Sequence, residues 1–455
     1  MPMKKYFSLS VLIFFLGLDK GFSQDVWNLQ HCIQYAIEHN LQLKQSKLST
    51  QTVQVNNAQA KLSYLPNLSG DATQYFSYGR SLNVTTNAYQ NNAEVSSNSF
   101  SISSNLPVFA GLTKYQMLKQ TESDLHAAKY DEAKMENDIA LNVAAYYLSI
   151  LNALEQLKIM QRQKEITEQQ VSQTQKLIDA GAAAEISIKD VEATLANDKL
   201  NIVNAQNNYD VAILNLKKWL SLDVNQTIQI DTIVPQNLNQ ANVDLGFENT
   251  YQTSHSSQPA ILSSQWRVRS ADRNVKYNRG ILFPTLSLFG TLRTSYSSAS
   301  YNYGIVNGNY VQLSKINFND QVNQNYGRSF GFDLSIPINN GFQNRSAYKR
   351  SAIQYLNAKL NLEIAEKQLQ QDVANAILNV KGAASKLEAT KAAALATQTA
   401  FDANTKKYEA GVINNFDYTT SKNNAAKSLS DLANAKFDYL FKIKILNYYQ
   451  GKPLY

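Results

Sequence analysis

The sequence contains a single cysteine, Cys32, in 455 residues. One cysteine excludes a disulfide within the chain and any metal site built on several cysteines. Prolines and glycines are also few, at 8 and 17, and such a shortage argues against an all-β chain with many turns. Charged residues make up 17% of the chain, below the roughly one quarter that is usual. The chain is therefore neither a disulfide scaffold nor a turn-rich β-protein.

Neither sign of charge dominates. The 43 Lys and Arg and the 36 Asp and Glu leave a net charge of +7, whereas a nucleic-acid site needs a clustered basic face. The four histidines are scattered, and neither a glycine-rich phosphate loop nor a G-x-S-x-G motif occurs. We therefore expect no nucleic-acid partner, no enzymatic activity, no cofactor and no metal site.

The N-terminal segment has the layout of a secretory signal peptide. Two lysines precede an apolar stretch, Leu9–Leu18, and Gly21-Phe22-Ser23 supplies small residues for cleavage before Gln24. We expect residues 1–23 to be removed on export.

After that segment the chain lacks any run of 18 consecutive apolar residues. The exported protein is therefore predicted to have no membrane-spanning helix. Cys32 lies too far from the cleavage point to be the lipid-carrying first residue of a lipoprotein. A free thiol packed at the start of a helix is the expected state of Cys32.

The rest of the chain contains the same pattern twice. Leu65-Pro66-Asn67-Leu68 matches Phe283-Pro284-Thr285-Leu286, 218 residues later. Asp179-Ala180-Gly181 matches Glu409-Ala410-Gly411, 230 residues later. The change of offset places an insertion of 12 residues within residues 287–336. Markers that recur in the same order indicate an ancestral duplication.

Each repeat has the same predicted order of elements: a helix, two strands, a very long helix that ends at a glycine, and a shorter returning helix. Alternating apolar and polar residues predict strands whose two faces meet different environments. Heptad spacing in stretches without proline predicts helices about 100 Å long. The first repeat, 24–245, is predicted to contain strands at about 67–80 and 95–109, a long helix at 112–180, a returning helix at 185–220 and an equatorial linker at 222–245. The second repeat, 246–455, is predicted to contain strands at about 284–298 and 327–338, a long helix at 342–410 and a returning helix at 415–449. In each repeat a polar, aromatic loop is expected to join the two strands, at 81–93 in the first repeat and at 299–326 in the second.

Four strands per chain cannot close a barrel. Open strand edges cannot lie in hydrocarbon, and the smallest closed membrane barrels have about eight strands. The apolar face of each strand fits lipid, the polar face fits a lumen, and tyrosines near the strand ends fit interfacial belts. Two chains would supply eight strands and three would supply 12, and the pattern does not choose between them. A soluble sandwich with one wet face is the alternative, against which the signal peptide and the long helices argue.

Short motifs at both ends of the chain carry a family resemblance. The opening Trp27-Asn28-Leu29-Gln30, with Tyr35-Ala36-Ile37 and Asn40, is similar to a W-x-L-x-x-x-(I/V)-x-x-A-L-x-x-N pattern. Tyr408-Glu409-Ala410-Gly411, followed by Leu432–Leu440, resembles two later signatures. In this order, on a duplicated frame, the motifs resemble the TolC-like outer-membrane efflux channel family, and the resemblance covers residues 25–455.

The resemblance implies a mixed fold of a membrane β-barrel and an α-helical coiled-coil barrel. A homotrimer would form one 12-stranded barrel in the outer membrane and a helical tunnel across the periplasm. The function implied is the exit duct of a tripartite efflux or secretion system. The partners implied are a periplasmic adaptor (membrane fusion) protein, an inner-membrane pump and outer-membrane lipid. The exported substrate is not indicated.

The resemblance also implies a gate at the periplasmic tip. In that family the closed tip is held by a Tyr, an Arg and two Asp around the second glycine. Tyr408 and Asp417 match the Tyr and the first Asp, whereas Ile413 and Thr420 occupy the other two positions. A ring of three Asp417 is therefore the expected constriction.

Small or apolar residues follow both tip glycines. Such a tip can accept another helical hairpin end to end. The residues expected to dock the adaptor are Gly181, Ala182, Ala183, Gly411, Val412 and Ile413.

Two other functions stay open. A passive outer-membrane porin would share the barrel but has no use for paired long helices. A structural coiled-coil spacer of the cell envelope would share the helices but has no use for strands patterned for a bilayer. The combination favours a conduit.

Overall fold

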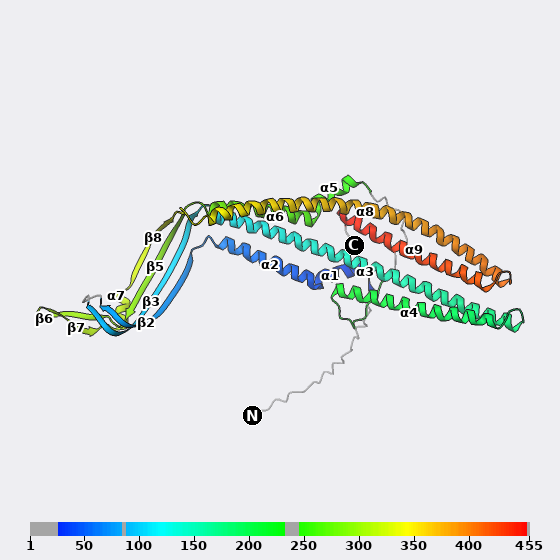
Figure 1. The fold of residues 1–455 in the computed structure, drawn as a ribbon, viewed down its shortest axis with the longest axis horizontal. Helices are drawn as coiled ribbons and strands as arrows, with labels where there is room; N and C mark the ends of the chain where they lie inside the picture. The colour runs from blue at the N-terminus through cyan, green and yellow to red at the C-terminus, as the bar shows by residue number, and fades with distance from the viewer. Residues whose placement is uncertain (1–25, 84–87, 233–244, 453–455) are drawn as a thin grey trace, which may run out of the picture.

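The computed structural model describes residues 26–83, 88–232 and 245–452. The predicted signal peptide, residues 1–23, and part of the predicted linker, 222–245, lie outside these ranges. The molecule is elongated, with a β-sheet at one end and the tips of two helical hairpins at the other (Figure 1).

Two helices of 67 residues each, α3 (Thr113–Asp179) and α8 (Gln343–Glu409), run along the molecule. At 1.5 Å per residue each is about 100 Å long. Each is followed by a helix of 35 residues that runs back along it, α4 (Ile186–Leu220) or α9 (Asn415–Tyr449) (Figure 1). All four helices begin and end within one residue of the ranges expected from the sequence.

Four shorter helices lie between the sheet and the middle of the molecule. They are α1 (Leu29–His39), α2 (Leu41–Leu62), α5 (Phe247–Ser257) and α6 (Pro259–Gly280). Asn40 separates α1 from α2, and its side-chain oxygen accepts hydrogen bonds from the N–H groups of Gln42 and Leu43. Near the sheet the helices contact one another in the order α2–α3–α6–α8.

The four long strands form one antiparallel sheet with the order β2–β3–β5–β8. They are β2 (Asn67–Asn83), β3 (Ala88–Ala110), β5 (Thr285–Ser297) and β8 (Gly327–Ser335). Within the described residues, β2 and β8 each pair on one side only. The helices near the sheet follow the same order as the strands to which they connect.

The strand register separates apolar from polar side chains. One face, called the apolar face below, carries Leu68, Ile102, Leu106, Leu288, Leu292, Phe330, Phe332 and Leu334. The opposite face carries Ser69, Asp71, Thr73, Ser99, Ser101, Ser103, Thr291, Arg293 and Ser329. Phe330 is 89% exposed and Phe332 is 73% exposed. A single chain therefore leaves the apolar face bare.

The predicted strand ends at 80, 95 and 338 were wrong. β2 continues to Asn83 and β3 begins at Ala88. The alternation could not be followed through this part of β3, because Gln90, Asn91 and Asn92 are three polar residues in succession. β8 ends at Ser335, just before Pro337, which has no N–H to donate to a ladder.

The loop expected at 299–326 is folded. It contains a hairpin of β6 (Tyr301–Val306) and β7 (Asn309–Lys315), followed by a short helix, α7 (Phe318–Gln324). The turn residues Asn307 and Gly308 both have positive φ, 53° and 82°, as a two-residue hairpin turn requires. This Asn-Gly pair was a turn signal in the sequence that the expectation of a loop overlooked.

The main hydrophobic core lies where α1 packs against α3 and α4. A two-stranded parallel pair, β1 (Val26–Trp27) and β4 (Gln229–Ile230), ties the described part of the linker to it. Cys32 is fully buried in this core and unpaired, so the expected packed thiol is confirmed. Burial raises the pKa of the thiol to about 12.

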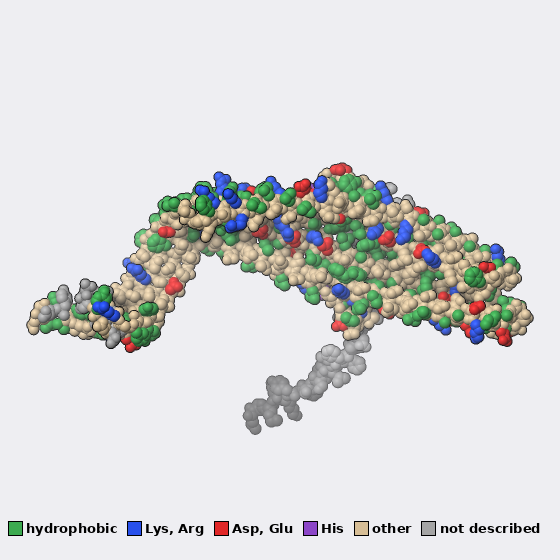
Figure 2. Space-filling model, in the orientation of Figure 1, with side chains coloured by type: hydrophobic (Ala, Val, Ile, Leu, Met, Phe, Trp, Pro, Cys, Tyr) green, Lys and Arg blue, Asp and Glu red, His purple; other side chains and the backbone are tan. Residues whose placement is uncertain are grey.

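None of the helices in the described ranges combines the length and the apolar character that crossing a membrane would take. Charged side chains of both signs are interspersed over the visible face of the molecule (Figure 2).

Candidate functional site: the tips of the helical hairpins

The two hairpins turn in the same way. Gly181 and Gly411 have φ of 72° and 71°, a left-handed conformation that a side chain would strain. The N–H groups of Ala182 and Val412 each donate to the carbonyl five positions earlier, at 2.8 Å. Together these features form a Schellman motif, which satisfies carbonyls at the end of a helix. The duplication therefore extends to the hydrogen bonds of the tips.

The start of the returning helix differs between the two tips. Asn414 caps α9, because its side-chain oxygen accepts the N–H of Asp417 at 2.8 Å. Glu185 makes no side-chain capping bond to α4 within the described chain. The Asp417 side chain is exposed in the first turn of α9, where the helix dipole favours a carboxylate.

The predicted docking residues surround these turns. Gly181, Ala182, Gly411 and Val412 are exposed, and Val412 is 71% exposed. Ala183 is half-buried, as is Ile413, which packs against an aromatic cluster just above the second tip.

The aromatic cluster consists of Phe401, Tyr408, Tyr418 and Ala425. The rings of Tyr408 and Tyr418 stack with centroids 4.6 Å apart, and burial raises the pKa of the Tyr418 phenol. The Tyr408 hydroxyl lies 3.3 Å from the Thr174 hydroxyl on α3. Tyr408 therefore contacts both hairpins, whereas no contact joins it to Asp417 in the described structure.

A row of hydrogen-bonded polar side chains, called the polar seam below, extends from this contact toward the sheet, between α3 and α9. The hydrogen-bonded pairs of the seam are Thr174–Tyr408 (Tyr408 being on α8), Gln170–Asn415, Thr167–Lys422, Gln156–Ser430 and Asn152–Asn434. The α3 members recur at intervals of three or four residues, or sums of these, as one face of a helix requires. The two hairpins therefore meet along the seam mainly through hydrogen bonds.

Lys422 is the most deeply buried charged residue of the seam. It is fully buried, and its Nζ donates to Thr167 Oγ1 at 2.6 Å and to Asp198 Oδ2 at 3.1 Å. Thr167 lies on α3 and Asp198 on α4, so three helices meet at one ammonium group. A buried charge is tolerated when it is paired and hydrogen-bonded.

Sequence reasoning missed Lys422. One signal was present, because Tyr418, Lys422 and Ala425 follow the 4, 3 spacing of a helix face that packs against others. A lysine at such a position indicates a buried partner. Within the described ranges, no three His, Cys, Asp or Glu side chains are grouped so that they could hold a metal ion.

Comparison with known proteins identifies the architecture. The sequence model of the outer membrane efflux protein family matches residues 32–221 and 250–442. The chain belongs to this family. It is 25% identical over 442 residues to the outer membrane protein TolC of Escherichia coli, which covers 93% of this chain and 83% of that protein. It is 22% identical to the outer membrane efflux protein BepC of Brucella suis, over 89% of this chain and 80% of that protein.

Solved structures of efflux channels share the fold. CusC superimposes with a TM-score of 0.78 at 16% identity, covering 93% of this chain and 92% of CusC. The Campylobacter jejuni CmeC outer membrane channel gives 0.77 at 17% identity, covering 93% and 85%. This outer membrane efflux protein is therefore an exit duct of an efflux or secretion system, located in the outer membrane. The function and location implied by the resemblance are confirmed.

We expect Lys422→Met to destabilise the hairpins by about 3–5 kcal/mol, because it leaves the Asp198 carboxylate buried without its partner. Thermal unfolding of the purified protein, followed by circular dichroism, measures the effect. Lys427→Met is the matched control: Lys427 is 76% exposed on the same helix and pairs with Asp431, so its loss is expected to change stability by less than about 0.5 kcal/mol.

The double variant Lys422→Met/Asp198→Leu separates charge from packing. Removing both charges together is expected to recover most of the lost stability. Equal melting of the Lys422→Met and Lys427→Met proteins would show that the buried pair does not support the structure.

Proposed function

We propose that this efflux protein is a homotrimer that joins an inner-membrane pump, through a periplasmic adaptor protein, to the outside of the cell. Three chains supply the 12 strands of one outer-membrane barrel and the helices of one coiled-coil tunnel. The observation that carries the proposal is that a single chain leaves two strand edges and two helix edges open on the same two sides.

The sheet supports closure by neighbouring chains. In the described structure β2 and β8 are edge strands, and bare edges cannot lie in hydrocarbon because their backbone groups would be unsatisfied. The exposed side chains of the apolar face suit a lipid environment, and the polar face suits a water-filled lumen. Pairing β2 of one chain with β8 of the next removes both edges.

The helices support the same closure. α2 carries an exposed apolar residue at every seventh position: Leu41, Leu48, Val55 and Leu62, which are 62–69% exposed. At the other side α8 carries Ile353, Leu356, Leu360 and Ile364, which are 55–65% exposed. Apolar stripes with heptad-like spacing pack against one another in coiled coils. The α2 stripe of one subunit therefore fits the α8 stripe of the next.

The far end of the helices suits the adaptor. Both hairpins end in an exposed glycine turn followed by a small or apolar residue, Ala182 or Val412, so a helical hairpin of the adaptor can continue the coiled coil end to end. Gly181, Ala182, Ala183, Gly411, Val412 and Ile413 are the proposed docking residues, with Ile413 acting mainly through its packing under the turn.

The gate is proposed to lie next to the docking residues, on the side of the sheet. Tyr408 holds the second hairpin to the first through Thr174. Three symmetry-related Asp417 carboxylates at the narrow end would form a ring that attracts cations. A purely structural role for Asp417, as a carboxylate favoured by the α9 dipole, is the alternative.

Assembly is tested on the α2 stripe. Leu48→Glu places a charge in the proposed interface and is expected to reduce the trimer fraction at least about tenfold, because burying an unpaired charge is costly. Light scattering after size-exclusion chromatography in detergent measures the fraction. Ser49→Glu adds the same charge at an exposed position on another side of α2 and is expected to leave the trimer intact. A wild-type monomer in detergent would contradict the proposal.

Docking is tested at the turns. Ala182→Glu and Val412→Glu are each expected to abolish export without lowering the amount of trimer in the outer membrane. Growth in the presence of toxic compounds that the wild-type duct helps to remove measures export. Gln169→Glu, which adds the same charge at an exposed position on α3 above the tip, serves as the control. Unchanged export in both tip variants would place docking elsewhere.

The gate is tested by conductance in planar bilayers. Tyr408→Phe keeps the stacking but loses the hydroxyl that meets Thr174, so single-channel conductance is expected to rise. Tyr418→Phe is the control, because the Tyr418 hydroxyl bonds Thr405 within its own hairpin. Asp417→Ala is expected to weaken cation selectivity. A lower melting temperature with unchanged selectivity would assign Asp417 to the structural role.

A further inference from the structure

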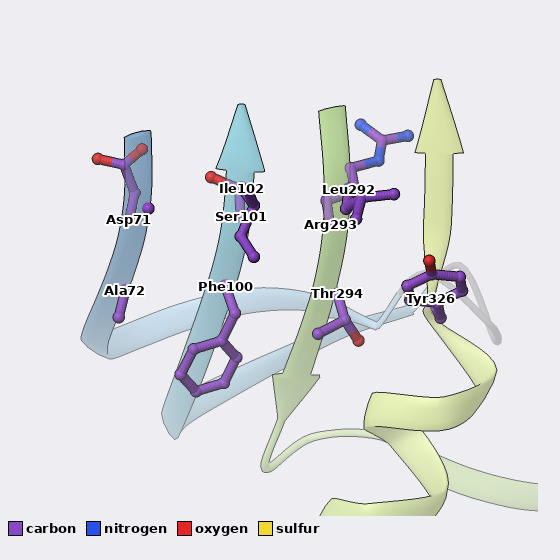
Figure 3. A pocket seen from close by; sticks show the side chains of 10 residues that line it. Asp71, Ala72, Phe100, Ser101, Ile102, Leu292, Arg293, Thr294 and Tyr326 are labelled. Carbon is purple, nitrogen blue, oxygen red and sulfur yellow. The ribbon is translucent and has the colours of Figure 1, made fainter. Parts of the chain in front are cut away.

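The apolar face of the sheet contains a groove at the end that lies away from the helices. The groove has a volume of about 390 Å³. Its walls on this face are Phe100, Ile102, Leu292, Thr294 and Tyr326, beside the small residues Gly70 and Ala72 (Figure 3). Asp71, Ser101 and Arg293, which alternate with these residues along the strands, complete the lining. The groove therefore arises because large aromatic or branched side chains stand beside residues with a very small side chain or none.

Helix α7 closes one side of the groove. Phe318 packs against Phe100 and Tyr296, with ring centroids 6.3 and 5.2 Å away. The Thr294 hydroxyl donates to the carbonyl of Val322 at 2.6 Å. These contacts fix α7 over the apolar face, so the groove is part of a folded structure and not a gap beside a loose loop.

Arg328 lies next to the groove on the same face. It is the register partner of Leu292, which lines the groove, and neighbouring strands are about 5 Å apart. Its side chain is exposed, and none of the ion pairs within the described ranges includes it. Among the residues of β2, β3, β5 and β8 that the register assigns to the paired part of the apolar face, Arg328 is the one cation.

A neighbouring subunit would not neutralise Arg328. In the proposed trimer β8 meets β2 of the next chain, and the apolar-face residues of β2 are uncharged: Leu68, Gly70, Ala72, Gln74, Phe76 and Tyr78. A charged side chain on a lipid-facing surface is costly unless it reaches water or a counter-charge. The counter-charge that a membrane offers at this depth is a lipid phosphate, which guanidinium groups bind with charge-assisted hydrogen bonds.

We propose that this groove is a lipid-binding site, in which one acyl chain fills the groove and the lipid's phosphate binds Arg328. The inference rests on the proposed trimer, because it requires the apolar face to meet the bilayer. The end of the sheet away from the helices then lies in the outer leaflet, so the ligand is a phosphate-bearing lipid of that leaflet. The bound lipid would fasten α7 and the rim of the barrel to the membrane.

The test is lipid binding to the purified wild-type trimer, counted by native mass spectrometry during titration with lipid A. Up to one lipid per subunit is expected. Arg328→Gln is expected to weaken binding about tenfold, as loss of a charge-assisted hydrogen bond predicts, and lipid A without its phosphates is expected to bind the wild type about as weakly. Ala72→Phe, which fills the groove, is expected to weaken binding by a similar factor.

Arg162→Gln is the matched control. Arg162 is an exposed arginine on α3, outside the sheet, so the same change of charge there is expected to leave lipid binding unaltered. Equal lipid binding by the wild type and Arg328→Gln, or equal binding of phosphorylated and dephosphorylated lipid, would overturn the inference.

Trimer formation and conductance are measured separately from lipid binding, so failure of the lipid site can be told apart from failure of the proposed assembly. If the wild type forms trimers and conducts in bilayers but does not bind lipid A, the lipid site alone is wrong. If the wild type does not form trimers, the proposed assembly fails first. Arg328→Gln is expected to leave trimer content and single-channel conductance unchanged.

Discussion

An unpaired strand edge cannot remain in the interior of a membrane, and the rest of this molecule is arranged around that constraint. Four strands per chain leave β2 and β8 open. The helices attached to the sheet lie in the same order as the strands, so α2 and α8 are open on the same two sides. Whatever closes the sheet therefore also brings the two apolar helix stripes together. In the proposed trimer, one association would therefore close both barrel and tunnel.

The long elements could be predicted because their signals are local. Heptad spacing of apolar residues marks the middle of α3 and of α8. Gly181 and Gly411 end these helices at left-handed turns that residues other than glycine rarely adopt. The alternation of the strands is equally local where the two faces differ. It fails in β3 at Gln90, Asn91 and Asn92, which are polar in succession, so the alternation does not mark where this strand begins.

The contacts between residues that are far apart in the sequence could not be predicted from local patterns. The partners of Lys422 lie 255 and 224 residues earlier in the chain, so a single sequence shows an unusual lysine but not what it binds. The position of Tyr408 came from resemblance to a family, whereas its contact with Thr174 required the fold. The need for glycine at position 111 also depends on a distant segment, because a Cβ there would lie 2.1 Å from the carbonyl oxygen of Gly280.

The two kinds of contact at the tip differ in the free energy that is lost when each is broken. The second hairpin holds an aromatic cluster, and exposing Phe401 or Tyr418 would lose about 25 cal/mol for each Å² of apolar surface. The seam between the hairpins is mainly hydrogen-bonded, and its polar groups exchange their partners for water at a net cost of about 1 kcal/mol each. Even Lys422 and Asp198 regain hydration when they separate, which offsets the loss of their pairing. Near the tip, separation along the seam would therefore cost less free energy than unfolding either hairpin, even though Ile166 of α3 would leave the aromatic cluster.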